Sequence, residues 1–377
     1  MELISRFIKA EKQSFFLLGP RGTGKSTFIQ KTFPDALYID LLLPDIFRNY
    51  NARPERLLET VHAHKNIKTV VVDEIQKAPQ LLEVVHSLIE EKRGLQFVMT
   101  GSSARKLRRT GVNLLGGRAL MKHMHPFMAA ELGSKFILEK ALQSGLVPVV
   151  MNSSDPMPAL HAYVDLYLRE EVLTEGLTRN IGSFSRFLEA VSFSHGAVLN
   201  ISNVARECQV ERKVVEGYIV ILEDLLLAYR IPVFSKRAKR ATASHPKFFF
   251  FDAGIYSALR PSGPLDSPEE KSGAALEGLV AQHLKAWIDY RNPACQLYYM
   301  RTSAGSEIDF VVYGKNLFWA IEVKNSATVH PQDIRALKAF KDDYPEAKRF
   351  LVYRGKEKLI RNGIYIEPCT DFLLKLK

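Results

Sequence analysis

The feature that most constrains the fold of this chain is a glycine-rich segment near its N-terminus. The segment follows a short apolar run, Phe15 to Leu18, and precedes a helical pattern that begins at Thr27. It has the form G-x-x-x-x-G-K-[ST], which between a strand and a helix is typical of a phosphate-binding loop. Its glycines let the backbone point N–H groups at phosphate oxygens, and the following helix adds its positive N-terminal end. The residues expected to bind a nucleotide are Gly19, Pro20, Arg21, Gly22, Thr23, Gly24, Lys25, Ser26 and Thr27.

A second apolar run, Thr69 to Val72, ends in Asp73 and Glu74 and is typical of a buried parallel strand. ATP and Mg²⁺ are therefore the expected ligands. Lys25 is expected to reach the β- and γ-phosphates, and Ser26 to place its hydroxyl on Mg²⁺. Asp73 would hold the metal through water, and Glu74 would polarise the attacking water. The alternative is a strand that ends in acids at the surface.

Composition and charge exclude several classes of protein. The 377 residues are 46% apolar and 25% charged, unlike a disordered, collagen-like or membrane-embedded chain, and their number favours two or three domains. Lys and Arg outnumber Asp and Glu by 52 to 41, so an anionic partner is expected. The three cysteines are too few and too scattered for a disulfide framework. With no signal peptide and no apolar run of about 20 residues, the protein is expected to be cytoplasmic, without a membrane partner.

A third apolar run, Leu95 to Met99, leads into the turn Thr100-Gly101-Ser102-Ser103-Ala104-Arg105. This turn, the glycine-rich segment and the residues from Val70 to Gln76 together resemble the AAA+ superfamily. The closer resemblance is to prokaryotic ATPases of that type with a C-terminal nuclease-like domain. It implies that Ser102 or Ser103 is a polar sensor at the end of the strand beside the Asp73 strand.

The same resemblance implies an arginine that touches the γ-phosphate, in cis or from a neighbouring copy. The best candidate is Arg118, in the segment Gly116-Gly117-Arg118-Ala119. A homo-oligomer is therefore expected. Arg105, Arg108 and Arg109 compete for the role, and a solvated basic face is the alternative for each of them.

The middle of the chain is helical in pattern. Apolar residues recur at helical spacing from Ala159 to Thr174, which favours a helical lid or connector. Further on, a short helix at Ser202 to Glu207 and a longer one at Glu211 to Leu227 precede two strands, at Ala228 to Val233 and Lys247 to Phe251. Two helices across a short turn followed by two strands describe a winged helix-turn-helix.

The basic residues of this region favour contact with nucleic acid, DNA above all. A strongly basic segment lies between the two strands, and two further cations stand at the start of the longer helix. Contact with the phosphate backbone is expected rather than sequence readout. The alternatives are a solvated loop and a surface for protein contacts, and Glu211 and Glu216 weaken the case for base reading. The candidate residues are Arg212, Lys213, Lys236, Arg237, Lys239 and Arg240.

The C-terminal part has a regular order of elements that resembles the PD-(D/E)xK nuclease fold. The order is αβββαβ, with expected elements at residues 274–290, 296–301, 307–313, 317–323, 331–341 and 349–353. Glu322 and Lys324, two residues apart on a strand, project to the same face. Asp309 and Glu322 can then share a Mg²⁺ ion with the carbonyl of Val323, while Lys324 orients or deprotonates the attacking water. Glu277 matches the additional metal-binding acid of the family.

The sequence therefore predicts an α/β protein with four domains. These are a P-loop ATPase core with a parallel sheet (1–130), a helical lid or connector (131–180), a winged helix-turn-helix (181–262) and a nuclease-like domain (263–377). The leading hypothesis is an ATP-hydrolysing enzyme that acts on nucleic acid, with metal-dependent phosphodiester cleavage by the last domain. The alternative is a nucleotide-gated regulator that binds DNA or protein without cutting, and a protein-remodelling ATPase is a third option.

Overall fold

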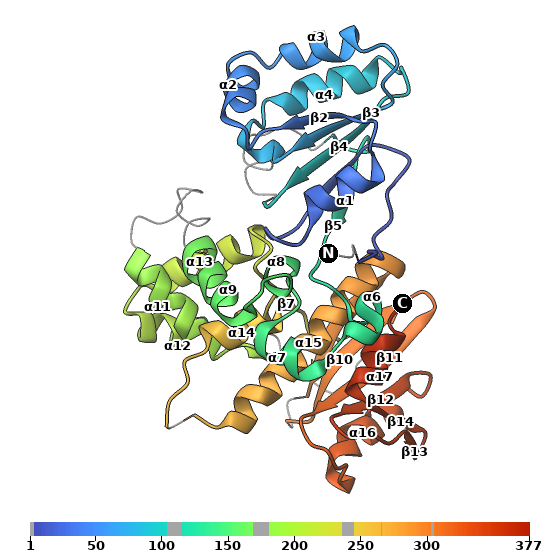
Figure 1. Cartoon of the computed structure of the whole chain (residues 1–377). Helices are drawn as coiled ribbons and strands as arrows, with labels where there is room; N and C mark the ends of the chain where they lie inside the picture. The colour runs from blue at the N-terminus through green and yellow to red at the C-terminus, as the bar shows by residue number, and fades with distance from the viewer. Residues whose placement is uncertain (1–3, 104–114, 169–180, 236–244, 265, 303–304) are drawn as a thin grey trace. The chain divides into compact units, whose positions relative to one another are not determined.

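The structure is a computed structural model that describes residues 4–103, 115–168, 181–235, 245–264, 266–302 and 305–377. The chain forms two compact units (Figure 1). The first, the P-loop unit, comprises Ile8–His125 with Glu223–Leu227. The second, called the large unit, comprises Met1–Phe7, Pro126–Leu222 and Ala228–Lys377.

The P-loop unit is built on a five-stranded parallel sheet with the strand order β2-β3-β4-β1-β5. Its strands are β1 (Phe15–Leu18), β2 (Leu37–Asp40), β3 (Thr69–Asp73), β4 (Gln96–Gly101) and β5 (Leu120–His123). The expected parallel sheet is confirmed, and the three apolar runs that predicted strands are β1, β3 and β4. Because every strand runs the same way, their carboxyl ends share the edge of the sheet where ligands bind in open α/β folds.

Helices cover both faces of this sheet. They are α1 (Lys25–Thr32), α2 (Pro44–Ala52), α3 (Arg56–Ala63), the short 3₁₀ helix η1 (Ile75–Lys77) and α4 (Leu81–Glu90). Phe16 and Leu18 point to the face where α3 and α4 bury their leucines and valines. Phe15 points to the opposite face, where its ring lies 6.3 Å from that of Phe33 just after α1. Strand residues therefore alternate between two buried faces, which explains why β1, β3 and β4 read as continuous apolar runs.

The large unit begins with short helices. They are α6 (Ala129–Leu132), the 3₁₀ helix η2 (Gly133–Lys135), α7 (Leu138–Ser144), α8 (Pro148–Met151), α9 (Pro156–Ala162) and the π-helix η3 (Tyr163–Leu168). The helical connector predicted at residues 131–180 is thus helical as far as residue 168, and residues 169–180 lie outside the described part of the chain. Pro148 and Pro156 stand in the first turns of α8 and α9, where their missing N–H groups leave no intrahelical bond unmade.

A helical segment and a three-stranded antiparallel sheet follow, with the strand order β6-β8-β7. The elements are α11 (Ile181–Ser192), β6 (Ala197–Val198), α12 (Ile201–Cys208), α13 (Arg212–Asp224), β7 (Ala228–Ile231) and β8 (Lys247–Phe250). The predicted helix pair and the two strands are present, and β6 was not predicted. The longer helix ends at Asp224 instead of Leu227, since Leu226 has a positive φ of 59°. The winged-helix assignment stays a prediction.

The C-terminal region is a six-stranded mixed sheet with the order β13-β14-β12-β11-β10-β9. Its elements and the helices around it are α14 (Ala253–Leu259), α15 (Pro268–Arg291), β9 (Cys295–Arg301), β10 (Glu307–Gly314), β11 (Leu317–Lys324), η4 (Pro331–Ile334), α16 (Arg335–Asp343), β12 (Lys348–Tyr353), β13 (Leu359–Arg361), β14 (Ile364–Pro368) and α17 (Cys369–Lys375). The predicted order of elements from α15 to β12 is confirmed. The last two strands and α17 were not predicted.

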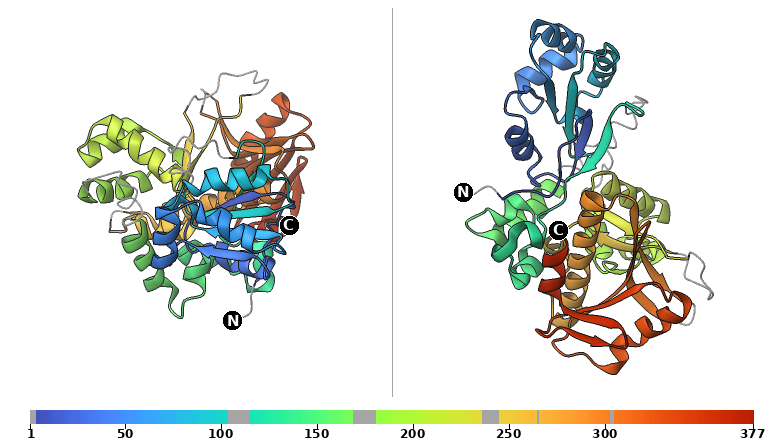
Figure 2. Two further views of the ribbon diagram at one scale, coloured as in Figure 1. Left: turned by 90° about the horizontal axis from the view of Figure 1, so that it is seen from above. Right: turned by 90° about the vertical axis from the view of Figure 1, so that its right-hand side faces the viewer.

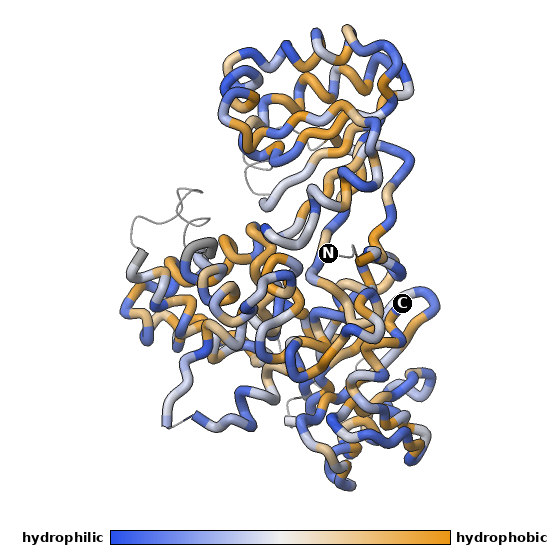
Figure 3. Tube along the Cα trace, viewed as in Figure 1, coloured by the Kyte–Doolittle hydropathy of each residue, from blue (hydrophilic) through white to orange (hydrophobic). Residues whose placement is uncertain are grey.

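Helices pack on both faces of the six-stranded sheet (Figure 2). Trp319 of β11 stacks on Trp287 of α15, with ring centroids 5.0 Å apart. The next residue, Ala320, points the other way into a core shared with Leu337 and Phe340 of α16. Figure 3 shows hydrophobic stretches along strands and an alternation of hydrophobic and hydrophilic residues along helices. No helix in the described part of the chain is long and apolar enough to cross a membrane.

The three-stranded and six-stranded sheets are joined within the large unit. The backbone N–H of Phe234 donates to the carbonyl of Tyr299 on β9 at 2.7 Å, and the N–H of Tyr299 donates to the carbonyl of Pro232 at 3.1 Å. The segment after β7 therefore runs beside β9. This junction fixes β8 close to the ends of β9 and β10, where the acidic residues of the C-terminal region lie.

Candidate functional site

The glycine-rich loop connects the carboxyl end of β1 to the first residue of α1. Gly22 and Gly24 adopt positive φ angles of 76° and 90°, a region that residues with a Cβ rarely enter. A Cβ on Gly19 would overlap the carbonyl of Met124. These glycines are therefore required by the path of the loop, which wraps tightly over the start of α1.

Lys25 is folded into this loop. Its ammonium donates to the carbonyl oxygens of Gly19 at 2.7 Å and Pro20 at 3.1 Å, and the side chain is almost fully buried. The hydroxyl of Thr23 also donates to the carbonyl of Pro20, at 2.8 Å. Lys25 thus lies beside the backbone that would surround a phosphate chain, as its predicted role requires. Arg21 and Thr27 are exposed on either side of the loop.

Asp73, at the end of β3, is buried and accepts hydrogen bonds from Tyr38 and from Thr100. The side chain of Ser26 lies next to the hydroxyl of Tyr38. Burial, together with the hydrogen bond and charge of Asp73, raises the pKa of Tyr38 well above its ordinary value. Ser26 and Asp73 therefore face one common point. A hydroxyl and a carboxylate oxygen are suitable ligands for Mg²⁺, so the residues fit the expected ion.

Glu74 follows in the left-handed region, with φ 60° and ψ 46°. Its backbone N–H donates to the hydroxyl of Thr100 at 3.0 Å. Its carboxylate accepts from the side-chain amide of Gln76, which also donates to the hydroxyl of Ser102 at 3.0 Å. The structure therefore joins the expected catalytic base to the expected sensor through Gln76. Tyr38, Thr100 and Gln76 are site residues to which the sequence analysis gave no role.

The remaining candidates of the P-loop unit are placed as follows. Ser103 is fully buried directly after Ser102. Arg118 pairs with Glu90 at the end of α4, and this pairing lowers the pKa of Glu90. A role for Arg118 at a γ-phosphate would require the pair to open. The competing candidates Arg105, Arg108 and Arg109 lie outside the described residues.

The acidic candidates of the C-terminal region come together across three elements of the large unit. Glu277 lies on α15, Asp309 on β10 and Glu322 on β11. The backbone N–H of Val323 donates to Asp309 at 2.8 Å, and Lys324 donates to Glu322 at 2.7 Å. The second carboxylate oxygen of Glu322, Oε2, is buried and has no hydrogen-bond partner among the described residues. Asp309 and the pair Glu322 and Lys324 are thus close together, as expected. Val323 contacts Asp309 through its N–H, whereas the prediction gave a role to its carbonyl.

A residue outside the predicted set lies among these acids. Lys247, the first residue of β8, is 1% exposed. Its ammonium lies 2.9 Å from Glu277, 2.5 Å from Glu307 and 3.6 Å from Asp309. No group of three or more His, Cys, Asp or Glu in the described ranges is arranged to hold a metal ion. The metal-ligand roles of Glu277, Asp309 and Glu322 stay a prediction, and the arrangement seen here is a cluster of ion pairs.

The electrostatics of the cluster follow from its burial. Desolvation and the nearby charge of Asp309 raise the pKa values of Glu277 and Glu322, while Lys247 and Lys324 oppose the rise. Burial alone would lower the pKa of Lys247, but the surrounding carboxylates outweigh it and hold the pKa above its ordinary value. Lys247 is therefore a permanently charged cation at neutral pH.

The nucleic-acid candidates are only partly described. Arg212 and Lys213 are exposed at the start of α13, and Arg212 pairs with Glu216 at 3.0 Å. Arg212 also lines a cavity of about 260 Å³ together with the segment 198–202 and His245. The other four candidates, Lys236, Arg237, Lys239 and Arg240, lie outside the described residues.

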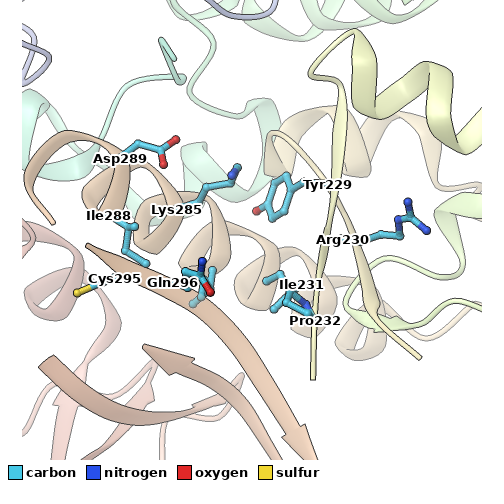
Figure 4. A pocket seen from close by; sticks show the side chains of 10 residues that line it. Tyr229, Arg230, Ile231, Pro232, Lys285, Ile288, Asp289, Cys295 and Gln296 are labelled. Atoms are coloured by element: carbon cyan, nitrogen blue, oxygen red, sulfur yellow. The ribbon is translucent and has the colours of Figure 1, made fainter. Parts of the chain in front are cut away.

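A second cavity, of about 330 Å³, opens between β7, α15 and β9 (Figure 4). The ring of Tyr229 lies beside Lys285, whose ammonium is 5.3 Å from the ring centroid. The hydroxyl of Tyr229 is buried, and no residue in the described ranges forms a hydrogen bond with it. None of the residues that line this cavity belongs to the predicted sites. Its lining is Tyr229, Arg230, Ile231, Pro232, Lys285, Ile288, Asp289, Cys295, Gln296 and Leu297.

Comparison with protein families divides the chain into three matched regions. Residues 11–133 match an AAA domain, residues 135–266 match a domain of unknown function (DUF8612), and residues 272–372 match another domain of unknown function (DUF4143). The N-terminal part of the chain is therefore a P-loop ATPase domain of the AAA class. An AAA domain implies nucleotide binding, in agreement with the loop geometry.

Comparison with solved structures finds distant matches. The chain is 13% identical to AMPPCP-bound DnaA from Aquifex aeolicus over 56% of this chain and 82% of that one, with a TM-score of 0.26. It is 13% identical to replication initiator DnaA bound to AMPPCP and single-stranded DNA over 57% and 83%, also at 0.26. Protein VC1899 from Vibrio cholerae is 14% identical over 97% and 96%, at 0.23. The comparison with curated proteins finds no match.

Proposed function

We propose that this protein hydrolyses ATP and uses the resulting change of state to act on nucleic acid. The observation that carries the proposal is the convergence of Ser26 and Asp73 on the hydroxyl of Tyr38, beside the loop that contains Lys25. This is the grouping that a metal–nucleotide complex requires: a loop for phosphates, a lysine, a hydroxyl and a buried carboxylate.

Each residue of the nucleotide site has a separate proposed role. The loop N–H groups and the N-terminus of α1 bind the phosphates, and Lys25 turns from the loop carbonyls towards the β- and γ-phosphates. Ser26 and Asp73 would hold Mg²⁺, which supplies positive charge against the charge that develops on the phosphates. Glu74 orients and polarises a water molecule. Gln76 holds the carboxylate of Glu74 and ties it to Ser102.

The nucleic-acid partner is proposed from charge. The chain has a formal net charge of +11, and its densest basic cluster is the segment from Lys236 to Arg240. Contact with DNA phosphates through this segment, with help from Arg212 and Lys213, would be weakly dependent on sequence and strongly dependent on salt. We also propose a homo-oligomer in which Arg118 leaves Glu90 and completes a neighbour's nucleotide site.

For the C-terminal region, the ion pairs of Lys247 favour the non-cleaving alternative over phosphodiester hydrolysis. A lysine ammonium already neutralises the carboxylates that a metal-dependent nuclease would need. The region would then serve as a nucleotide-gated regulator that binds DNA or a partner protein. Cleavage remains the second candidate, because Asp309, Glu322 and Lys324 are close enough to act together. We also propose that the chain has four domains, with boundaries after residues 130, 180 and 262.

Two assays test these proposals. ATP turnover by the full chain should fall about 100-fold or more in Glu74→Gln and in Lys25→Ala, since each change removes a group that acts in the transition state. Unchanged turnover in Glu74→Gln would show that the base is misassigned. The second assay offers linear, branched and single-stranded DNA with Mg²⁺ or Mn²⁺, with and without ATP. Cleavage that Lys324→Ala abolishes would establish the second candidate and overturn the regulator.

A further inference from the structure

The acidic cluster of the large unit contains its own cation. The ammonium of Lys247 contacts carboxylates from two elements, α15 and β10, through Glu277, Glu307 and Asp309. It also lies 5.4 Å from the ring centroid of Tyr299. Lys247 lies on β8 of the three-stranded sheet. It is therefore not part of the segment from α15 to β12, whose order of elements resembles a nuclease.

The packing around Lys247 holds it in place. The strand that carries it is buried at all of its positions. Nearby, a Cβ on Gly278 of α15 would overlap the imidazole of His195, and Gly196 lies against the carboxylate of Glu277. The turn before β6 and the helix α15 are therefore in close contact beside the ion pairs. Withdrawal of Lys247 would require this contact to open, and it would leave buried carboxylates without a counter-charge.

The cluster as it stands does not suit a divalent ion. A metal shared by Glu277 and Asp309 would lie close to a fixed positive charge that already binds both carboxylates, and the two cations would repel one another. Lys324 donates to one carboxylate oxygen of Glu322, while Oε2 is buried and has no partner in the described part of the chain. One carboxylate oxygen is thus available, but the other acids are engaged by lysines.

We propose that the ammonium of Lys247 takes the place of a divalent metal among Glu277, Glu307 and Asp309, so that the chain in this conformation binds no metal there. The lysine is a built-in replacement cation that fastens β8 to α15 and β10. The inference does not depend on ATP hydrolysis, because every residue in it belongs to the large unit.

The experiment measures Mn²⁺ binding to the nucleotide-free full chain by electron paramagnetic resonance. The informative variant is Lys247→Met combined with Glu307→Gln, which removes one charge of each sign and keeps Glu277, Asp309 and Glu322. Glu307→Gln alone is the matched control, because it leaves Lys247 in place. Asp309→Asn, alone and added to the double variant, identifies which bound Mn²⁺ belongs to this cluster.

We expect the wild type and Glu307→Gln to hold no Asp309-dependent Mn²⁺ in the millimolar range. The double variant should bind one Mn²⁺ with a Kd at least about tenfold below 1 mM, and Asp309→Asn should abolish that binding. The proposal is overturned if the wild type binds Mn²⁺ as tightly as the double variant does and this binding depends on Asp309. Circular dichroism checks that the double variant is folded. If the double variant does not fold, the wild type is compared with Asp309→Asn. Mn²⁺ binding that differs between these two proteins overturns the proposal. The absence of Mn²⁺ binding in both supports it.

Discussion

The hydroxyl of Tyr38 donates a hydrogen bond to the carboxylate of Asp73, across two neighbouring strands and 35 residues of sequence. The side chain of Ser26 lies next to the same hydroxyl. Tyr38 therefore occupies the point at which the two proposed Mg²⁺ ligands meet. A Mg²⁺ ion held by Asp73 would compete with this hydroxyl for the carboxylate.

Tyr38→Phe should lower the Mg²⁺ concentration needed for ATP hydrolysis. A hydrogen bond of this kind contributes about 1 kcal/mol net, and its loss corresponds to about a fivefold shift in the half-maximal Mg²⁺ concentration. The measurement is ATP turnover as a function of free Mg²⁺. Tyr50→Phe is the matched control, because the hydroxyl of Tyr50 bonds to Thr60 within helices of the same unit. A higher Mg²⁺ requirement in Tyr38→Phe would mean that Tyr38 helps to hold the ion.

Gln76→Ala should reduce kcat for ATP about tenfold, a loss of roughly 1.4 kcal/mol, while KM stays near the wild-type value. Gln76 holds the carboxylate of Glu74 but is not proposed to touch the nucleotide, so its removal disorders the base without weakening ground-state binding. Gln80→Ala is the control. Gln80 lies at the start of α4, and its side-chain amide donates to Asn51 of α2. A large rise in KM with unchanged kcat would contradict the positioning role.

The sequence predicted the P-loop unit well because its signals are local. The loop glycines, the apolar runs of β1 and β3 and the two acids at the end of β3 are each readable within about ten residues. Tyr38 and Lys247 escaped for the opposite reason. Each lies in a strand of only four residues, and its contacts are with partners that only the fold brings near. Lys247 begins the run Lys-Phe-Phe-Phe, which reads as a strand end, while its partners lie 30 and more residues later.

Lys247→Met alone should destabilise the large unit by about 3–5 kcal/mol, because it leaves several carboxylates buried without a counter-charge. The chain's two tryptophans, Trp287 and Trp319, both lie in this unit, so their fluorescence during urea unfolding reports on it. Lys315→Met, at an exposed position between β10 and β11, should be nearly neutral. Adding Glu307→Gln should restore part of the loss. Equal stabilities for Lys247→Met and the wild type would show that the ion pairs contribute nothing.

Replacing Lys236, Arg237 and Lys239 by alanine should weaken DNA binding and flatten its salt dependence. For every phosphate that the protein no longer neutralises, the slope of log K against log salt concentration becomes shallower by about 0.9. The matched control replaces Arg335, Lys338 and Lys341, exposed on α16, and therefore also removes two lysines and one arginine. Fluorescence anisotropy with labelled duplex and single-stranded DNA measures the binding of both triple variants. An equal weakening in the two would mean that net charge, and not the basic segment, governs binding.

His283 should make the large unit acid-sensitive. It is fully buried on α15, where Nε2 accepts from the backbone N–H of Ala129 at 2.8 Å and Nδ1 lies 2.8 Å from the carbonyl of Leu279. Burial lowers the pKa of His283 from 6.5 to about 4, although the bond to Leu279 opposes the shift. A depressed histidine pKa means that the unfolded chain takes up a proton first as the pH falls. The stabilisation is therefore complete above pH 6.5 and is lost towards pH 4.

The loss over this range is about 3 kcal/mol for His283, from the relation between a pKa difference and free energy. Buried His195, whose pKa falls to about 3 through desolvation, should add a loss of the same sign. The test is urea unfolding, followed by tryptophan fluorescence, at several pH values between 7 and 4. His283→Asn should be less stable at pH 7 but should lose less stability on acidification. His86→Asn, at an exposed position on α4, should follow the wild type. Parallel curves for His283→Asn and the wild type would show that His283 does not titrate with unfolding.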